Sequence, residues 1–249
     1  MKRIFVFLML FIGTAAVAHT INWYVDGNIF HTTTCESGED ITPPTAPEKY
    51  GYTFKEWLSY IPIEYLETNG AQQQYIDTGY IPNNNTGIEI KIQNMAANTN
   101  DNTYFFGAGE SAQIRSFESY SWAKQMTFNY DSNNTTNSLP DREPFIIKWN
   151  KNHIQYTDPN YDYTYILPDK IFTAPYTMYL LALHRPKEST AIVKLRIYYA
   201  KIYDNDFLIR DFIPVLDKNG TPCLLDLVEK KFYYNAGTGD FIAGPVIGE

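Results

Sequence analysis

The chain has 249 residues, with 20 Lys and Arg against 28 Asp and Glu, so its formal net charge is −8. This acidic balance argues against nucleic acid or anionic lipid as a partner, because either would need a basic face. Aromatic residues make up 16% of the chain, and its 21 tyrosines suit half-buried sheet faces as well as surfaces that contact carbohydrate or protein.

Residues 1–18 have the composition of a secretory signal peptide. Lys2 and Arg3 give a positive start, Ile4 to Ile12 is apolar, and Ala16 to Ala18 is a cleavage site of small residues. Removal of this segment takes away two basic residues and no acids, which leaves a net charge of −10. An uncleaved anchor is the alternative, but the apolar run is short for a span of about 20 residues. No other run is long enough, so we expect an exported chain without a membrane span.

Residues 19–60 are expected to form a small separate unit. Ile21 to Asp26 and Ile29 to Thr34 are predicted strands joined by a tight turn at Asp26-Gly27. The following segment, GEDITPPTAPEKYGYTFKEW, resembles the internalin-type B repeat, a β-grasp-like unit of bacterial surface proteins. Phe54 and Trp57 are expected in its core, with a binding role as the alternative.

Residues 61–249 show short apolar stretches separated by Gly, Asn and Pro, which predicts a β-sandwich. Tyr179 to Leu183 is apolar on both faces and is expected to be a central strand. Asp131 to Asp141 is expected to be a polar loop. No segment has a helical period, although residues 141–145 and 167–172 could each form one helical turn.

The last quarter contains the longest predicted strand, Ile192 to Asp204. Its alternation slips at Tyr199-Ala200, which indicates a bulge. After a turn, Phe207 to Ile213 is predicted to return as the next strand. Pro214 and Pro222 are expected in the loop that follows.

Two segments carry a resemblance for this main domain: PIEYLETNGAQQQYIDTGYIPNNNTGIEIKIQ and AKIYDNDFLIRDFIPVLDKNGTPCLLDLVEKKFYYNAGTGDF. They are similar to the entry and closing strands of laminin G-like, concanavalin A-like jelly-roll modules in bacterial and phage surface proteins. The resemblance spans residues 61–245 and implies an all-β, antiparallel jelly-roll sandwich. Such modules act as lectins, adhesins, enzymes or spacers, so the fold alone does not decide the function.

Catalysis by a glycoside hydrolase needs two carboxylates about 5–9 Å apart. The laminarinase-like branch carries them on one strand as E-x-D-x-x-E, a pattern that this sequence lacks. Glu64 and Glu67, like Asp226 and Glu229, are spaced by three and so point to opposite faces of a strand. We expect no catalysis, with a divergent glycoside hydrolase as the first alternative and a spacer without a ligand as the second.

No cofactor is expected, because no His pair has metal-ligand spacing and no Cys-x-x-Cys motif occurs. Asp158, Asn160 and Asp162 alternate as the first ligands of a calcium loop do, but Tyr163 stands where such a loop needs Gly. We therefore expect a hairpin turn here, with calcium as the alternative. Gly107-Ala108-Gly109 is expected to be a turn at a strand end and lacks the Lys of a phosphate loop.

Cys35 and Cys223 fall in different predicted modules and are expected to stay unpaired. A disulfide that joins the two modules is the alternative, since the chain is expected to be exported.

The expected ligand-binding residues are aromatics and oxygen-bearing side chains at the rim of the sandwich. Aromatic rings on loops or sheet faces stack on sugars, while Asp and Asn bond hydroxyls. Ordinary packing is the alternative for the aromatics. We expect a binding or adhesion protein of the bacterial cell envelope or exterior, with a glycan or a surface protein as its ligand and no indication of its oligomeric state. The site residues are Tyr120, Trp122, Asp158, Asn160, Asp162 and Tyr163.

Overall fold

The structure is a computed structural model, and it describes residues 5–6, 18–25, 28–36, 39–51, 53–54, 57–96, 102–111, 113–138, 142–186 and 193–247. The regular elements within these ranges are β-strands, and every pairing between them is antiparallel. The same residues contain no helix long and apolar enough to cross a membrane. The predicted all-β sandwich is confirmed.

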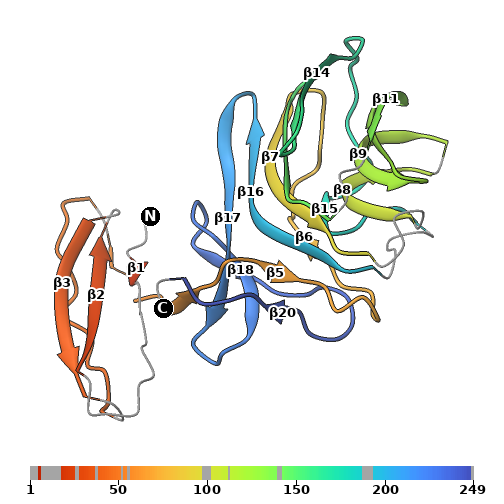
Figure 1. The fold of residues 1–249 in the computed structure, drawn as a ribbon. Helices are drawn as coiled ribbons and strands as arrows, with labels where there is room; N and C mark the ends of the chain where they lie inside the picture. The colour runs from red at the N-terminus through yellow and green to blue at the C-terminus, as the bar shows by residue number, and fades with distance from the viewer. Residues whose placement is uncertain are drawn as a thin grey trace.

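Two sheets pack face to face in the main domain (Figure 1). The smaller sheet has six strands, in the spatial order β11 (Asn133–Ser138), β10 (Gln125–Tyr130), β9 (Arg115–Trp122), β8 (Thr103–Gly109), β15 (Tyr179–Leu180) and β6 (Ile76–Asp77).

The larger sheet has eleven strands and extends beyond the smaller one (Figure 1). Its main path runs through β14 (Asp162–Ile166), β13 (His153–Thr157), β12 (Phe145–Asn150), β7 (Thr86–Asn94), β16 (Leu195–Asp204), β17 (Phe207–Asp217), β18 (Pro222–Asp226) and β19 (Lys231–Tyr233). Three short strands pair at its side: β4 (Tyr60–Pro62), β5 (Leu66–Glu67) and β20 (Ile242–Ala243).

Aromatic side chains fill the space between the two sheets. Trp149 of β12 is 1% exposed and stacks on Phe117 of β9, with ring centroids 4.1 Å apart. Phe128 of β10 meets the same indole edge-on at 5.8 Å. The isoleucines of β7 at positions 88, 90 and 92 face this core, because alternate residues of a strand share one face. The charged residues between them therefore face outward.

The long hairpin of β16 and β17 agrees with the sequence in part. The expected slip is confirmed, since the pairing of β16 with β7 shifts register between Ile197 and Tyr199. β16 begins at Leu195 rather than Ile192, which lies outside the described residues. β17 is longer than predicted and includes Pro214, while Pro222 begins β18, so the expectation that both prolines stand in a loop is wrong.

The geometry of the sheet explains why Pro214 is tolerated inside β17. Its carbonyl accepts a hydrogen bond from the backbone N–H of Ile63 at 3.1 Å. In an antiparallel strand the N–H and C=O of one residue point to the same side. The missing N–H of Pro214 therefore faces the place where the short β4 ends, and the ladder between β17 and β18 loses no hydrogen bond.

β11 is a strand that the sequence did not predict. β11 lies within the segment Asp131 to Asp141 that was expected to be a loop, and it pairs with β10 over all six of its residues. β11 contains only Asn, Ser and Thr, so it has no apolar pattern. This composition is tolerated because β11 is an edge strand whose side chains are alternately exposed. The single helical turns considered at 141–145 and 167–172 are absent wherever the structure describes these residues.

The N-terminal unit is a hairpin with its own small core, drawn apart from the sandwich in Figure 1. β2 (His19–Val25) and β3 (Asn28–Cys35) pair across a two-residue connection, as predicted. The ring of Trp57 lies 5.3 Å from that of Trp23 and packs against the core, as expected. Phe54 is half-buried and lies at the edge of this cluster, with its ring 5.3 Å from that of Trp57.

Part of the expected signal peptide is described. Phe5 and Val6 form a short strand, β1 (Phe5–Val6), that pairs with the edge of β2. Most of the remaining residues of the segment 1–18 lie outside the described residues, so cleavage after Ala18 stays a prediction.

Both cysteines are free and buried, in two separate clusters. Cys35 packs with Ile21 and Trp23 of the N-terminal hairpin. Cys223 packs with Val215 and Leu225, on the side of β17 and β18 that residues 58 and 60 cover. The structure therefore has no disulfide between the two parts.

Candidate functional site

The two predicted aromatic site residues lie on the smaller sheet. Tyr120 is half-buried on β9, with the guanidinium of Arg115 4.8 Å from its ring centroid and the ring of Tyr104 edge-on to it at 6.3 Å. Trp122 ends β9 and is 65% exposed. The indole therefore lies at the surface, and its role in binding stays a prediction.

The predicted oxygen-bearing residues lie on the β13–β14 hairpin of the larger sheet. Oδ1 of Asp158 accepts hydrogen bonds from the backbone N–H of Asn160 at 2.8 Å and of Tyr161 at 3.0 Å, and Oδ2 accepts one from the Tyr156 hydroxyl at 3.0 Å. These hydrogen bonds stabilise the turn between β13 and β14. Across the described part of the chain, no three His, Cys, Asp or Glu side chains gather in a way that could hold a metal ion.

The last two predicted residues point to different sides of β14. The carboxylate of Asp162 accepts hydrogen bonds from Nε2 of Gln155 at 3.2 Å, on the outer face of the sheet. Tyr163 faces inward and stacks on the core residue Tyr156, with centroids 6.1 Å apart. The six predicted residues therefore fall into two groups, one on each sheet, and the contacts of the two groups do not connect.

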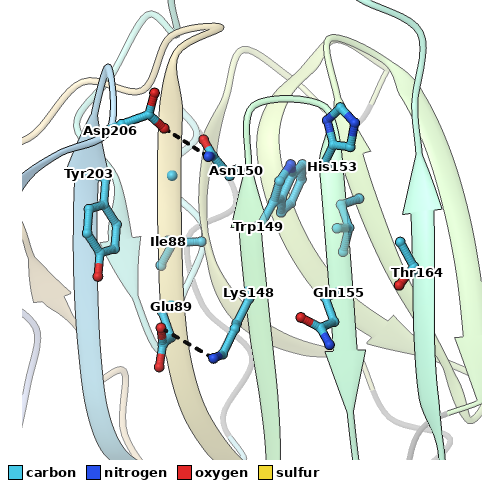
Figure 2. A pocket seen from close by; sticks show the side chains of 12 residues that line it. Ile88, Glu89, Lys148, Trp149, Asn150, His153, Gln155, Thr164, Tyr203 and Asp206 are labelled. Atoms are coloured by element: carbon cyan, nitrogen blue, oxygen red, sulfur yellow. Dashed lines mark hydrogen bonds and ion pairs between the residues drawn. The ribbon is translucent and has the colours of Figure 1, made fainter.

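A hollow of about 540 Å³ lies elsewhere, on the outer face of the larger sheet (Figure 2). It crosses β16, β7, β12, β13 and β14. Its floor contains Gly87, whose cross-strand partners are Tyr203 on β16 and Asn150 on β12. A Cβ atom at Gly87 would lie 3.2 Å from Cβ of Tyr203, so a side chain here would crowd the hollow. The missing side chain is thus part of what makes this surface concave.

The strand register sets the walls of the hollow. One row across the sheet contains Glu89, Lys148, Gln155 and Thr164, which are aligned as cross-strand partners. A second row contains Asn150 and His153. Figure 2 shows Tyr203 on the side of β16 and Thr164 on the opposite side, with the amide and imidazole groups between them.

The charges in the hollow are paired. Nζ of Lys148 lies 3.8 Å from Oε2 of Glu89, whose Oε1 also accepts a hydrogen bond from the Tyr199 hydroxyl at 3.0 Å. Oδ1 of Asp206 accepts a bond from Nδ2 of Asn150 at 2.9 Å, and its Oδ2 lies 3.1 Å from Nζ of Lys151.

Asp206 stays ionised at neutral pH. The hydrogen bond from Asn150 and the bond and charge of Lys151 hold the pKa of its carboxyl below the ordinary value. It therefore acts as a hydrogen-bond acceptor. Beside these pairs, the hollow offers the neutral polar side chains of Gln155 and Thr164 and the aromatic ring of Tyr203.

This hollow was not predicted from the sequence. Its residues are scattered from position 87 to position 206 and meet only through the register of five strands. One signal was available, because a Gly at the start of the Ile88 strand marks a place where another group approaches the backbone closely. Asp162 is the one predicted residue that touches the hollow, through its bond to Gln155.

No protein-family model matches this chain. The hollow is therefore interpreted from its own chemistry.

Proposed function

We propose that this chain is an exported, non-catalytic binding protein that takes a glycan in the hollow over Gly87. The observation that carries the proposal is a concave sheet surface with uncharged amide and hydroxyl groups and an imidazole next to one tyrosine ring. A sugar presents hydroxyls that bond such groups and an apolar C–H face that stacks on an aromatic ring. The volume of the hollow, about 540 Å³, falls within the range of about 300–1,000 Å³ for small-ligand sites.

The pairing of charges supports a neutral ligand. Lys148 is offset by Glu89, and Lys151 is offset by Asp206, so neither wall presents an uncompensated charge. An acidic ligand would also approach a chain whose net charge is −8.

The state of the carboxylates supports binding over hydrolysis. A glycoside hydrolase needs one carboxyl group that holds a proton near the working pH. Asp206 has a lowered pKa, so it is not arranged as that acid. The two carboxylate oxygens of Glu89 are engaged by Lys148 and by the Tyr199 hydroxyl. A divergent glycoside hydrolase, the alternative function, would need its catalytic acid at another place in the chain.

The site of action is proposed from the sequence. The signal-like segment 1–18 and the resemblance to internalin-type and laminin G-like modules support a role at the bacterial cell envelope or exterior. Adhesion to a glycan-bearing surface is the process that fits both features.

The proposal is tested by probing the exported protein on a glycan array and titrating each positive glycan by calorimetry. We expect one class of neutral glycan to bind and Gly87→Ala to weaken it several-fold, because the new methyl group fills the floor. No binding by any glycan on the array would contradict the proposal.

A further inference from the structure

A second hollow lies at the end of the sandwich, next to the first. It has a volume of about 620 Å³. Residues 82–85 and 170–174 frame it and are joined by backbone hydrogen bonds. The N–H of Asn84 donates to the carbonyl of Phe172 at 3.2 Å, and the N–H of Ala174 donates to the carbonyl of Pro82 at 2.7 Å. Its lining includes Asn84, Asn85, Lys151, Asn152, Lys170 and Ile171.

The ion pair of Lys151 and Asp206, called the ridge below, stands between the two hollows, since Asp206 lines the first and Lys151 the second. Gly87 belongs to the first and Asn85 to the second, and they are two residues apart on one chain. The ridge consists of Lys151 and Asp206, whose side chains are joined at 3.1 Å and are 41% and 60% exposed. The backbone fixes its position, because the N–H of Lys151 donates to the carbonyl of Thr86 at 3.0 Å and that of Asn205 to Asn85 at 3.2 Å.

We propose that the two hollows form one continuous binding surface and that its ligand is an oligomeric glycan chain that crosses the Lys151–Asp206 ridge. This inference rests on the proposed function. The first hollow alone crosses five strands, which is about 19 Å at the usual strand spacing of about 4.8 Å. That length exceeds one sugar ring, and Asp206 itself lines the first hollow, so a chain bound there lies beside the ridge.

The ridge is suited to a chain of hydroxyl-bearing units. An exposed ion pair contributes little to stability, because water screens it. Its ammonium group has three donors and its carboxylate several acceptor positions, so hydroxyls of a ligand can bond both groups without leaving either charge unsatisfied.

The second hollow offers groups of the same kind as the first. Asn84 and Asn85 supply amides, and the exposed Lys170 supplies a donor. Ile171 is 94% exposed and lines this hollow, so its apolar side chain is accessible to a ligand. Its role here is to contact the C–H face of a sugar unit beyond the ridge.

The experiment is a titration of the exported protein with oligosaccharide ladders of two to six units, prepared from cellulose, xylan, mannan and chitin. We expect affinity to rise with chain length. The double variant Lys170→Ala/Ile171→Ala should weaken binding of the six-unit chain several-fold and leave the two-unit chain unchanged. The control is Lys218→Ala/Val228→Ala, which removes an exposed cation and an exposed apolar side chain outside both hollows and should change neither.

Two results would overturn the inference, and only the second of them would also contradict the proposed function. Affinity that depends on Tyr203 but not on chain length or on the double variant confines the ligand to the first hollow and leaves the proposed function standing. Failure of every ladder to bind removes both the continuous surface and the neutral-glycan function.

Discussion

The guanidinium of Arg185 holds the carboxylate of Glu118 through two hydrogen bonds, with Nε donating to Oε1 at 2.9 Å and Nη2 to Oε2 at 2.5 Å. Glu118 is 0% exposed and Arg185 7% exposed. A Cβ atom at Gly109 would collide with Oε1 of Glu118, so this glycine of β8 makes room for the carboxylate. The pair thus fastens the segment after β15 to the outer face of the smaller sheet, and Gly107-Ala108-Gly109 is part of a strand rather than the expected turn.

Loss of the arginine should destabilise the fold strongly. Arg185→Met leaves a buried carboxylate without its partner, which typically costs about 3–5 kcal/mol. Burial raises the pKa of Glu118 even beside Arg185, and the variant should raise it further. A carboxyl group whose pKa is raised in the folded state stabilises the fold at low pH, and this stabilisation is lost as the pH rises. The loss of unfolding free energy in the variant should therefore be larger at pH 8 than at pH 5. Urea unfolding at both pH values measures it.

The second change Glu118→Gln is the control for that variant. It removes the buried charge, so the double variant should recover part of the stability and lose the pH dependence. A single variant within about 0.5 kcal/mol of the parent chain would show that the pair does not anchor the segment.

The two tryptophans of the sandwich should respond oppositely to truncation. Trp149→Ala removes the centre of the aromatic core and should cost about 3–5 kcal/mol of unfolding free energy. Trp122→Ala removes a side chain that is 65% exposed and should stay within about 0.5 kcal/mol. Equal losses of unfolding free energy in the two variants would mean that Trp122 is buried in the folded chain, which would contradict the structure.

The cysteines should be unreactive in the folded chain and free in the unfolded chain. Burial raises the pKa of the Cys223 thiol to about 12, and the thiolate is the reactive form. An aromatic disulfide reagent should therefore label Cys35 and Cys223 slowly in native buffer and fully in denaturant without reductant. Two protected cysteines in denaturant would reveal a disulfide and contradict the structure.

Asp217 should support stability at neutral pH and lose this role in acid. Its Oδ1 accepts bonds from the backbone of Asn219 at 2.8 Å and Thr221 at 2.9 Å, and Oδ2 accepts one from the Tyr234 hydroxyl at 2.9 Å. Burial pushes its pKa up, but these bonds outweigh burial and hold the pKa below the usual value. A carboxyl group whose pKa is lowered in the folded state stabilises the fold above the unfolded pKa of about 3.9, and this stabilisation is lost as the pH falls.

The matched variant is Asp217→Asn, which keeps the shape and removes the charge. It should cost about 1–3 kcal/mol at pH 7 and flatten the fall in stability between pH 5 and pH 2. An unchanged acid slope would show that other carboxylates account for the acid sensitivity.

The sequence predicts the fold well where the periodicity is strong. The isoleucines of β7, the bulge of β16 and the core position of Trp57 follow from local patterns, and the structure confirms each. β11 was missed because an edge strand made of Asn, Ser and Thr has no apolar signal.

The site was harder to predict than the fold. Tyr203 and Asn150 become neighbours only because each pairs with Gly87, and single-sequence patterns do not specify pairing between distant strands. The predicted rim residues Trp122 and Asp158 were chosen by residue type. The register places them on different sheets, so residue type alone did not identify one site.

The most direct test compares Tyr203→Ala with Trp122→Ala in calorimetric titration of a neutral glycan that binds the exported protein. The two variants each remove one aromatic ring, from the hollow and from the outer face of the smaller sheet respectively. Loss of a stacking ring typically costs on the order of 1 kcal/mol, a several-fold drop in affinity. The proposed function predicts that drop for Tyr203→Ala and none for Trp122→Ala. A drop for Trp122→Ala with unchanged binding by Tyr203→Ala would contradict it and place the ligand at the rim.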